Sequence, residues 1–581
     1  MILNLLIGII ISFLAYYYGV LPFVFGNKKI PENPFFISLI GIGILGIFSQ
    51  FILLGGKADS FSLLVIIIGG LVIKWRYAHL VQTETKKSLI ALAHFPETSL
   101  YAFLICSILI AYQSAQVTKI NDMGMYYLQT IKWVESYGLV KGIANLHPAY
   151  GLFSAWHSLT ALFSCHNFLT AIGMPETLKY LGLNGLLLSL SLGYFLWEGV
   201  NKPNSYLFIY SLISIFLGFL YLSAPSPDLP IIIYTGLLVY LALGKEELNW
   251  VIFILSCFAF SLKPPALLPV IIGLLAFKNL WLLFKIEQSG LSQAKKIVRI
   301  SSLLLMPILL LAPLIYKNHI VSGHILYPMS NQSFSSVAKY LPKPEWQVPA
   351  DWNQAYRTGI INWGNKDDFS TSVVKTNIQN NSIINQFTVW WLRAGYKGLV
   401  NKLISFIWIF GFVILLLHKS KRLSLGKTIT NTMRFFIGLT LLILVIEWLI
   451  LRQYRLLLPS TIVLSSLSLG LFIPRKISEK MTFLPSIILV AFLFLSFIPF
   501  SLMKDSSRNK QITNFEGFEP RNLILPFYQY QDTSVFKGYC WDKPLPCQSV
   551  SHRQFLHQFG YEVQSLGNST SEGFKMVSVK K

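Results

Sequence analysis

The chain is organised around residues 121–157, NDMGMYYLQTIKWVESYGLVKGIANLHPAYGLFSAWH, which interrupt a long series of apolar runs. The stretch opens with a carboxylate, Asp122. After it, apolar and polar side chains alternate at helical spacing, which favours a short helix lying in the membrane surface. An acid and such a helix just outside a membrane span suit work on a phosphate carried by a lipid. The alternative is that Asp122 only caps the helix.

The composition around this stretch is that of a membrane protein. The 581 residues are 54% hydrophobic and only 13% charged, and the mean hydropathy is +0.56, which excludes an ordinary soluble protein. The formal net charge of +23 first reports orientation in a membrane, because no module of interleaved basic and aromatic residues accompanies it. We therefore expect the lipid bilayer, and no nucleic acid, as a partner.

Apolar runs of membrane-spanning length recur almost to the end of the chain and predict an all-α polytopic protein with about 13 to 15 transmembrane helices. The first run lacks a basic start and a cleavage site, so it is predicted to be a retained span rather than a signal peptide. The expected spans are 1–25, 35–54, 61–79, 98–115, 150–166, 178–200, 205–223, 230–243, 250–262, 265–284, 300–316, 402–418, 432–450, 453–473 and 482–503.

Lysine and arginine in the short loops set the orientation. Four basic loops, at 74–87, 285–299, 419–427 and 475–480, are predicted to be cytoplasmic. This leaves 116–149, 317–400 and the tail 504–581 on the outer face of the membrane. Counts from the two sides of Asp228 disagree, so one segment within 150–223 is expected not to cross. The segment 150–166 is short for a span.

The tail carries Cys540 and Cys547 in CWDKPLPC, a spacing unlike a metal knuckle and typical of a small disulfide loop in an oxidising compartment. The other three cysteines lie in apolar runs and are expected to pack as inert side chains.

Several polar residues near the outer face are candidates for binding a phosphate. Lys263, between two apolar runs, could neutralise a lipid phosphate or only reach to the membrane edge. Arg452 and Arg455 enter a membrane segment and suit bidentate phosphate contacts, unless Glu447 or Asp122 pairs with them. Asp228 lies in SAPSPD, where prolines unwind a helix end, and is expected to face a cavity or to cap the next helix.

Lys317, Asn318, His319 and His324 crowd the exit of the span 300–316. Histidines and nearby acids leave a divalent cation open as a cofactor, but no tight ligand spacing supports one, so no metal ligand is predicted. The chain has no Walker A loop, G-x-S-x-G or H-E-x-x-H motif, which argues against ATP-driven transport, serine hydrolysis and zincin chemistry.

These features resemble the GT-C type glycosyltransferases, membrane enzymes that take a sugar from a polyprenyl-phosphate carrier. The likeness rests on the outer-face Asp122 before an amphipathic helix, the second acid Asp228, the exit from Lys317-Asn318 to Tyr327-Pro328, and the start from Arg455 to Pro459. The wording of 131–159, PSPDLP and CWDKPLPC is also similar to bacterial membrane proteins grouped with those enzymes. The likeness covers roughly 100–581. The chain departs from the pattern in its single acid at 122 and in Lys317, where arginine is usual.

The resemblance implies a GT-C-like fold and an inverting transfer from a polyprenyl-phosphate-linked sugar to a glycan, lipid or protein acceptor. Asp122 would be the general base. The substrate would be bound by Tyr126, Asn145, His147, His157, Asp228, Lys263, Lys317, Asn318, Arg452 and Arg455. Loop residues Trp346, Trp352, Asn353, Trp363 and Asn365 would hold sugar by stacking and hydrogen bonding.

The expected organisation has five parts: 1–97, extra N-terminal helices; 98–316, the GT-C-like core; 317–400, a large periplasmic loop; 401–503, C-terminal helices; and 504–581, a periplasmic tail. One alternative function is an O-antigen polymerase or ligase, which should concentrate arginines in the large loop. Another is a lipid-linked sugar flippase or transporter, which should carry ionisable residues in the middle of several spans.

Overall fold

The fold is known from a computed structural model that describes most of the chain. The described residues are 2–26, 28–115, 122–164, 166, 180–201, 205–218, 221–244, 248–264, 266–286, 293–329, 343–354, 356, 383–392, 395–417, 431–451, 453–471, 545–547, 556 and 560–579. Most of them are helical, and the one sheet among them is a two-stranded hairpin. The prediction of an all-α membrane protein is confirmed at this level.

Five described helices are long and apolar enough to cross a membrane: α1 (Ile2–Phe25), α2 (Pro34–Gly55), α15 (Gln293–Ser322), α20 (Gly395–Leu417) and α21 (Asn431–Leu451). A sixth span results if α3 (Ser60–Arg76) and α4 (Ala78–Ala93), which meet at 83°, count as one. Shorter apolar segments are α11 (Ser205–Gly218), α12 (Asp228–Gly244), α13 (Asn249–Leu262) and the part Leu267–Leu283 of α14 (Leu267–Ile286). The described residues thus give fewer full-length spans than the sequence predicts.

Helix α2 is the central element of the bundle. It begins where the sequence allows, because Pro34 suits the first helical position and the Asn33 side chain accepts hydrogen bonds from two of the first backbone N–H groups. It packs against α1 so closely that a Cβ at Gly41 would overlap the Ala15 backbone. Its other neighbours are α8 (Ala155–Phe163), α10 (Leu183–Asn201), α13 and α15. The first spans therefore pack directly against the predicted core 98–316.

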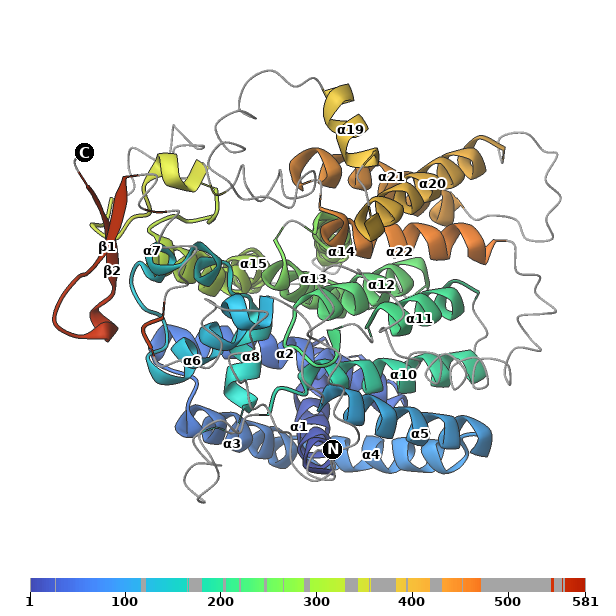
Figure 1. Ribbon diagram of the computed structural model, residues 1–581. Coiled ribbons are helices and arrows are strands. Elements are labelled where there is room, and N and C mark those ends of the chain that lie inside the picture. Colours follow the sequence, from blue (N-terminus) through green and yellow to red (C-terminus); the bar gives the residue numbers. More distant parts are fainter. Residues whose placement is uncertain are drawn as a thin grey trace.

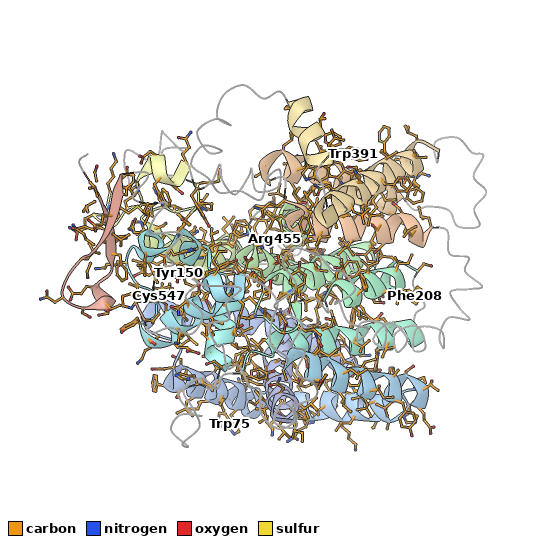
Figure 2. All side chains as sticks on the ribbon, viewed as in Figure 1. Trp75, Tyr150, Phe208, Trp391, Arg455 and Cys547 are labelled. Atoms are coloured by element: carbon orange, nitrogen blue, oxygen red, sulfur yellow. The ribbon has the colours of Figure 1, made fainter. Side chains whose placement is uncertain are left out.

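In Figure 1, α5 (Glu97–Ser114), α10, α11, α12, α13 and α22 (Tyr454–Gly470) have roughly parallel axes and lie one above another across the view. Apolar side chains such as Trp75 remain exposed on the outside, as lipid-facing residues do (Figure 2). The short helix α19 (Ile383–Trp391) packs against α20.

One end of the bundle carries the short elements of residues 122–163. The π-helix η1 (Met123–Tyr127) leads into α6 (Leu128–Ser136), followed by α7 (Ile143–Leu146), the 3-10 turn η2 (Pro148–Leu152) and α8. Because α8 has only nine residues, the expected span at 150–166 is wrong. The helix after Asp122 is not simply a surface helix, since α6 packs against α8 and its polar side chains Gln129, Thr130 and Glu135 are buried.

The C-terminal tail covers this end. Strands β1 (Tyr561–Ser565) and β2 (Phe574–Ser578) form an antiparallel hairpin in which Tyr561 pairs with Ser578 and Ser565 with Phe574. The hairpin lies beside α7 (Figure 1), and the Phe574 N–H donates to the Lys141 carbonyl at 2.9 Å. The Phe574 ring meets Trp133 of α6 edge-on, with centroids 5.8 Å apart. Residues far apart in the sequence thus hold the described part of the first outer loop, residues 122–149, in place; this part is called the first loop below.

Candidate functional site

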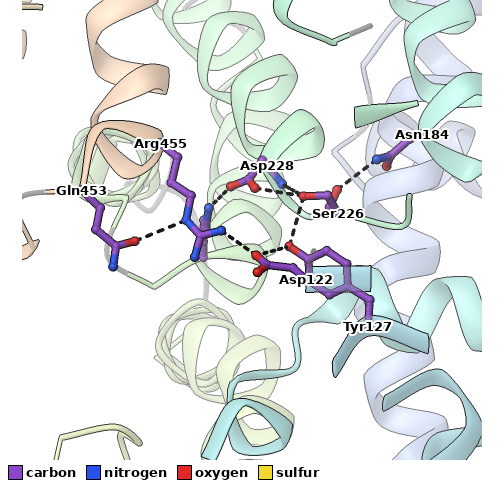
Figure 3. A network of polar contacts seen from close by, with 8 residues as sticks. Asp122, Tyr127, Asn184, Ser226, Asp228, Gln453 and Arg455 are labelled. Atoms are coloured by element: carbon purple, nitrogen blue, oxygen red, sulfur yellow. Dashed lines mark hydrogen bonds and ion pairs between the residues drawn. The ribbon is translucent and has the colours of Figure 1, made fainter. Parts of the chain in front are cut away.

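Four charged side chains meet at the end of the bundle that carries the first loop. Figure 3 labels three of them, Asp122, Asp228 and Arg455. Asp122 immediately precedes η1, and Asp228 is the first residue of α12. Lys263 follows the last residue of α13, and Arg455 lies in the first turn of α22. Each residue stands at a helix end, where the chain leaves the apolar bundle. Four segments that are distant in sequence therefore contribute one charge each.

The first ion pair joins the first loop to α22. Arg455 Nη1 lies 2.5 Å from Asp122 Oδ2, and Arg455 Nε donates to Gln453 Oε1 at 3.3 Å. The Asp122 side chain makes no capping hydrogen bond to η1, and its backbone is already helical. The alternative that Asp122 acts only as an N-cap is therefore wrong. Of the partners expected for the arginines, Arg455 takes Asp122, whereas Glu447 Oε1 accepts from the Leu267 N–H that opens α14.

The second ion pair joins Lys263 Nζ to Asp228 Oδ1. Ser226 Oγ donates to the other oxygen of Asp228 at 2.9 Å. The turn that carries Ser226 is fixed by Asn184 of α10, whose side-chain amide donates to three backbone carbonyls, those of Tyr221, Ala224 and Ser226. Asp228 is thus both the first residue of a helix and the partner of a lysine.

Tyr127 links the two pairs. Its hydroxyl lies 3.5 Å from Asp122 Oδ2 and 3.3 Å from Ser226 Oγ, which in turn bonds Asp228. Tyr127, Ser226 and Asn184 are not among the site residues that the sequence predicts. Ser226 lies within the SAPSPD segment that drew attention to Asp228, but Tyr127 read as an apolar position of the helix and Asn184 gave no signal.

The four charges are not equally accessible. The exposed fraction of the side chain is 32% for Arg455, 18% for Lys263, 10% for Asp122 and 4% for Asp228. An anion that enters from outside would therefore reach Arg455 first and Lys263 second. The carboxylates lie deeper, each behind its cation.

An aromatic layer lies beside the first ion pair. The ring of Tyr127 lies 4.9 Å from that of His157 and 4.4 Å from that of Tyr126. Burial and the charge of Asp122 raise the pKa of Tyr126 above its ordinary value. Burial, with a smaller effect from Lys317, lowers the pKa of His157 to about 3, so its imidazole is neutral. The rings of Tyr126 and His157 thus both lie against Tyr127, whose hydroxyl is 3.5 Å from Asp122 Oδ2.

Lys317 and Asn318 occupy the exit of α15. Lys317 Nζ donates to the Phe153 carbonyl at 2.6 Å and lies 4.7 Å from the centroid of the Phe153 ring. Asn318 donates to the Ile325 carbonyl at 3.0 Å, a local contact that shapes the turn after the helix. Lys317 therefore contacts Phe153, four residues before His157, whereas the described contact of Asn318 is with the turn after α15.

Asn145 and His147 lie away from the ion pairs. The Asn145 amide donates to the carbonyls of Trp346 and Phe574, at 2.8 and 3.0 Å, and so fastens the large loop and the hairpin to α7. His147 Nδ1 accepts from the Ala149 N–H and opens η2. Burial lowers the pKa of His147 to about 4. In this structure both residues make contacts that hold the loop together.

The expected sugar-binding residues are only partly in view. Trp352 and Asn353 are buried rather than presented on the surface, and the ring of Trp346 lies 5.2 Å from Lys141 Nζ. Trp363 and Asn365 lie outside the described residues, as does Arg452.

Cys547 is disulfide-bonded, and the Tyr150 hydroxyl donates to its carbonyl at 3.2 Å (Figure 2). Cys540 lies outside the described residues, so its pairing with Cys547 stays a prediction. Within the described ranges no three acidic, histidine or cysteine side chains gather in a way that could hold a metal ion.

The family model described as "Domain of unknown function (DUF8201)" matches residues 1–458. No curated protein and no solved structure matches the chain significantly. The matched range includes the four charged residues Asp122, Asp228, Lys263 and Arg455. It also includes residues 1–97, which were expected to be an N-terminal extension, whereas the hairpin 561–578 lies outside it.

Proposed function

The chain belongs to the DUF8201 family, and we propose that it is a membrane glycosyltransferase that moves a sugar from a polyprenyl-phosphate carrier to an acceptor hydroxyl. The proposal places the transfer on the periplasmic face of a bacterial inner membrane. The observation that carries it is the meeting of Asp122, Asp228, Lys263 and Arg455 at one end of a bundle of apolar helices. A lipid-borne phosphate reaches such a site from the bilayer, and two cations there match its charge.

Asp122 would be the general base. Its carboxylate would take the proton of the acceptor hydroxyl while the hydroxyl oxygen attacks the anomeric carbon of the sugar. The bond between that carbon and the phosphate oxygen breaks, and the electron pair leaves with the lipid phosphate. The new bond forms on the face opposite the leaving group, so the configuration inverts.

Arg455 and Lys263 would stabilise the phosphate as its charge develops. Because Arg455 is the most exposed of the four and holds Asp122 at 2.5 Å, an arriving phosphate would compete with Asp122 for the guanidinium. The exchange would leave the base free when the donor is in place. Tyr127, with its hydroxyl between Asp122 and Ser226, would keep the carboxylate oriented after the arginine has moved.

The position of the charges favours an enzyme over a transporter of lipid-linked sugars. The described ion pairs of the site lie at helix ends, whereas a transport path would require ionisable groups along the middle of several spans. An O-antigen polymerase or ligase remains the other enzymatic alternative. The fate of the lipid-linked sugar distinguishes the transporter from an enzyme, and the length of the product distinguishes the polymerase.

The donor half of the proposal can be tested with farnesyl phosphate, a short mimic of the leaving lipid phosphate. We expect the purified full chain in detergent to bind it, and Arg455→Gln to weaken binding about tenfold or more, as for loss of a charge-assisted contact. Arg434→Gln, an exposed arginine on α21, is the matched control and should bind normally. Equal affinity of all three proteins would remove the phosphate role of Arg455.

The transfer itself is tested with a radiolabelled polyprenyl-phosphate sugar and a membrane extract as acceptor. A glycosyltransferase releases polyprenyl phosphate and labels the acceptor with a single sugar. A transporter moves the lipid in vesicles and leaves it intact, and a polymerase produces a ladder of lengths.

A further inference from the structure

Lys317 differs from the two cations already described. It is 7% exposed, and its Nζ contacts the Phe153 carbonyl and ring. Arg455 and Lys263 each face a carboxylate, but within the described part of the chain no carboxylate lies in ion-pair distance of Lys317. A buried ammonium group with one carbonyl partner retains donors that need acceptors. The chain itself supplies none in the described residues.

His157 adds a second donor from the same segment. Its Nδ1 accepts from the Ser154 N–H at 3.1 Å, so the proton of the neutral ring resides on Nε2. His157 is 1% exposed, and Nε2 has no hydrogen-bond partner among the described residues. Ser154 directly follows Phe153, so one short turn, residues 153–157, carries both His157 and the carbonyl that Lys317 contacts.

Tyr127 relates these donors to the ion-pair network. Its ring lies 4.9 Å from the His157 ring, and its hydroxyl reaches Asp122 and Ser226. A ligand that contacts Asp122 across this tyrosine could therefore also reach the turn 153–157. Lys317 Nζ and His157 Nε2 are both donors, so they select an acceptor-rich, negatively charged substituent.

We propose that Lys317 and His157 bind an anionic substituent, a carboxylate or a phosphate, on the sugar that is transferred or on the acceptor glycan. This inference rests on the proposed glycosyl transfer and names its substrate class, an acidic sugar. Its two residues differ from Lys263 and Arg455, the cations assigned to the lipid phosphate. Binding of this substituent would explain why Lys317 is buried without a described acidic partner, an arrangement that lowers stability.

Binding to the wild-type full chain in detergent is the first test. The probes are D-glucuronate, glucose 6-phosphate and D-glucose, which share a ring and differ in the substituent at carbon 6. We expect at least one of the two acidic sugars to bind about tenfold more tightly than glucose, since hydrogen bonds to charged groups are the stronger ones. Preference for glucuronate identifies a carboxylate, and preference for glucose 6-phosphate a phosphate. Equal affinity for all three probes would overturn the proposal.

Lys317→Met keeps the length of the side chain and removes its charge. We expect it to bind the acidic probe as weakly as glucose and to melt at a higher temperature than wild type, because an unpaired buried charge is gone. Lys278→Met, at an exposed lysine of α14, should change neither property. A lower melting temperature with unchanged acidic-sugar affinity would show that Lys317 only holds the Phe153 carbonyl, and the proposal would fail.

The same proteins separate this inference from the proposed function. Loss of acidic-sugar binding in Lys317→Met with normal farnesyl phosphate binding supports the second site by itself. If farnesyl phosphate does not bind wild type but the acidic probe does, the lipid-linked donor is wrong and the site stands. If farnesyl phosphate binds through Arg455 and the acidic probe shows no preference over glucose, the donor stands and the site is wrong.

Discussion

The two ends of the first loop, Asp122 and the Asn145–His147 segment, use polar side chains in different ways. Asp122 is bonded to side chains, chiefly the guanidinium of Arg455, which an arriving anion can reach. Asn145 and His147 are bonded to backbone groups, those of Trp346, Phe574 of the hairpin and Ala149 of η2. A side-chain ion pair can exchange partners when a ligand binds, whereas a buried backbone group cannot lose its partner without cost. Polar residues in one loop therefore divide by what they contact.

The largest effect is expected from Asp122→Asn. Loss of a general base should lower transfer by about 10²- to 10⁴-fold. Because asparagine carries no charge, Arg455 becomes free for the donor, so farnesyl phosphate should bind at least as tightly as to wild type. Single-turnover transfer and calorimetric titration measure the two properties. Retention of most activity, or weaker binding of farnesyl phosphate, would contradict the exchange between Asp122 and phosphate.

Acidification should lower the stability of the protein through His147, at the other end of the loop. The pKa of His147 is lowered to about 4 in the folded protein, against about 6.5 unfolded, so the unfolded state binds more protons between these values. Stability from the neutral ring is therefore complete above pH 6.5 and is lost as pH falls, by about 3 kcal/mol at pH 4. His157 acts in the same direction.

Melting temperatures of wild type and His147→Asn across pH 4 to 7 measure this effect. As the pH falls, the melting temperature of wild type should decrease more than that of His147→Asn, by the contribution of one histidine. Asparagine retains an acceptor for the Ala149 N–H but does not titrate in this range. Parallel pH profiles for the two proteins would show that His147 does not contribute.

Asn145→Ala should have an intermediate effect. It leaves the carbonyls of Trp346 and Phe574 without their donor, at a cost of about 1 to 3 kcal/mol. Hydrogen exchange in the hairpin 561–578 and in α7 should accelerate, while farnesyl phosphate binding stays unchanged. A selective loss of ligand binding with normal exchange would move Asn145 to the ligand site and break the comparison.

The smallest effect is expected from Tyr127→Phe. The hydroxyl contacts are 3.5 and 3.3 Å long, so their loss should cost about 1 kcal/mol and lower transfer less than tenfold. Tyr150→Phe, which removes a contact to the Cys547 carbonyl instead, is the matched control and should leave transfer unchanged. Transfer reduced as much as in Asp122→Asn would give Tyr127 a direct role in the chemistry.

The sequence identified the four charged residues and named Asp122 as one alternative partner of the arginines, but it predicted neither the pair of Lys263 with Asp228 nor the meeting of the two pairs. Asp122, Asp228, Lys263 and Arg455 each interrupt an apolar run, and charge is conspicuous there. Their pairing depends on how α12, α13 and α22 pack, which periodicity along one segment does not encode. Tyr127 and Asn184 remained hidden for the same reason, because their partners are on other elements. A buried hydroxyl or amide in a helical pattern looks like any other residue of that pattern.

The first loop shows the opposite error. Gln129, Thr130 and Glu135 mark a polar face, from which a helix at the membrane surface follows. The structure buries these residues by contacts that come from elsewhere in the chain, including α8 beside α6. Length was the better guide for 150–166, since a short apolar run with a histidine formed a nine-residue helix and not a span.

The π-helix after Asp122 has a consequence for how such a site is inherited. Its hydrogen bonds reach five residues back, as in the bond from the Leu128 N–H to the Met123 carbonyl, so the turn holds one residue more than an α-helical turn. Loss of a single codon within 123–127 would rewind it and rotate Asp122 by about 100° about the axis of α6. The carboxylate would then turn away from Arg455 although every functional residue is still encoded. In related genes, the number of residues between the acid and Leu128 therefore carries as much meaning as their identity.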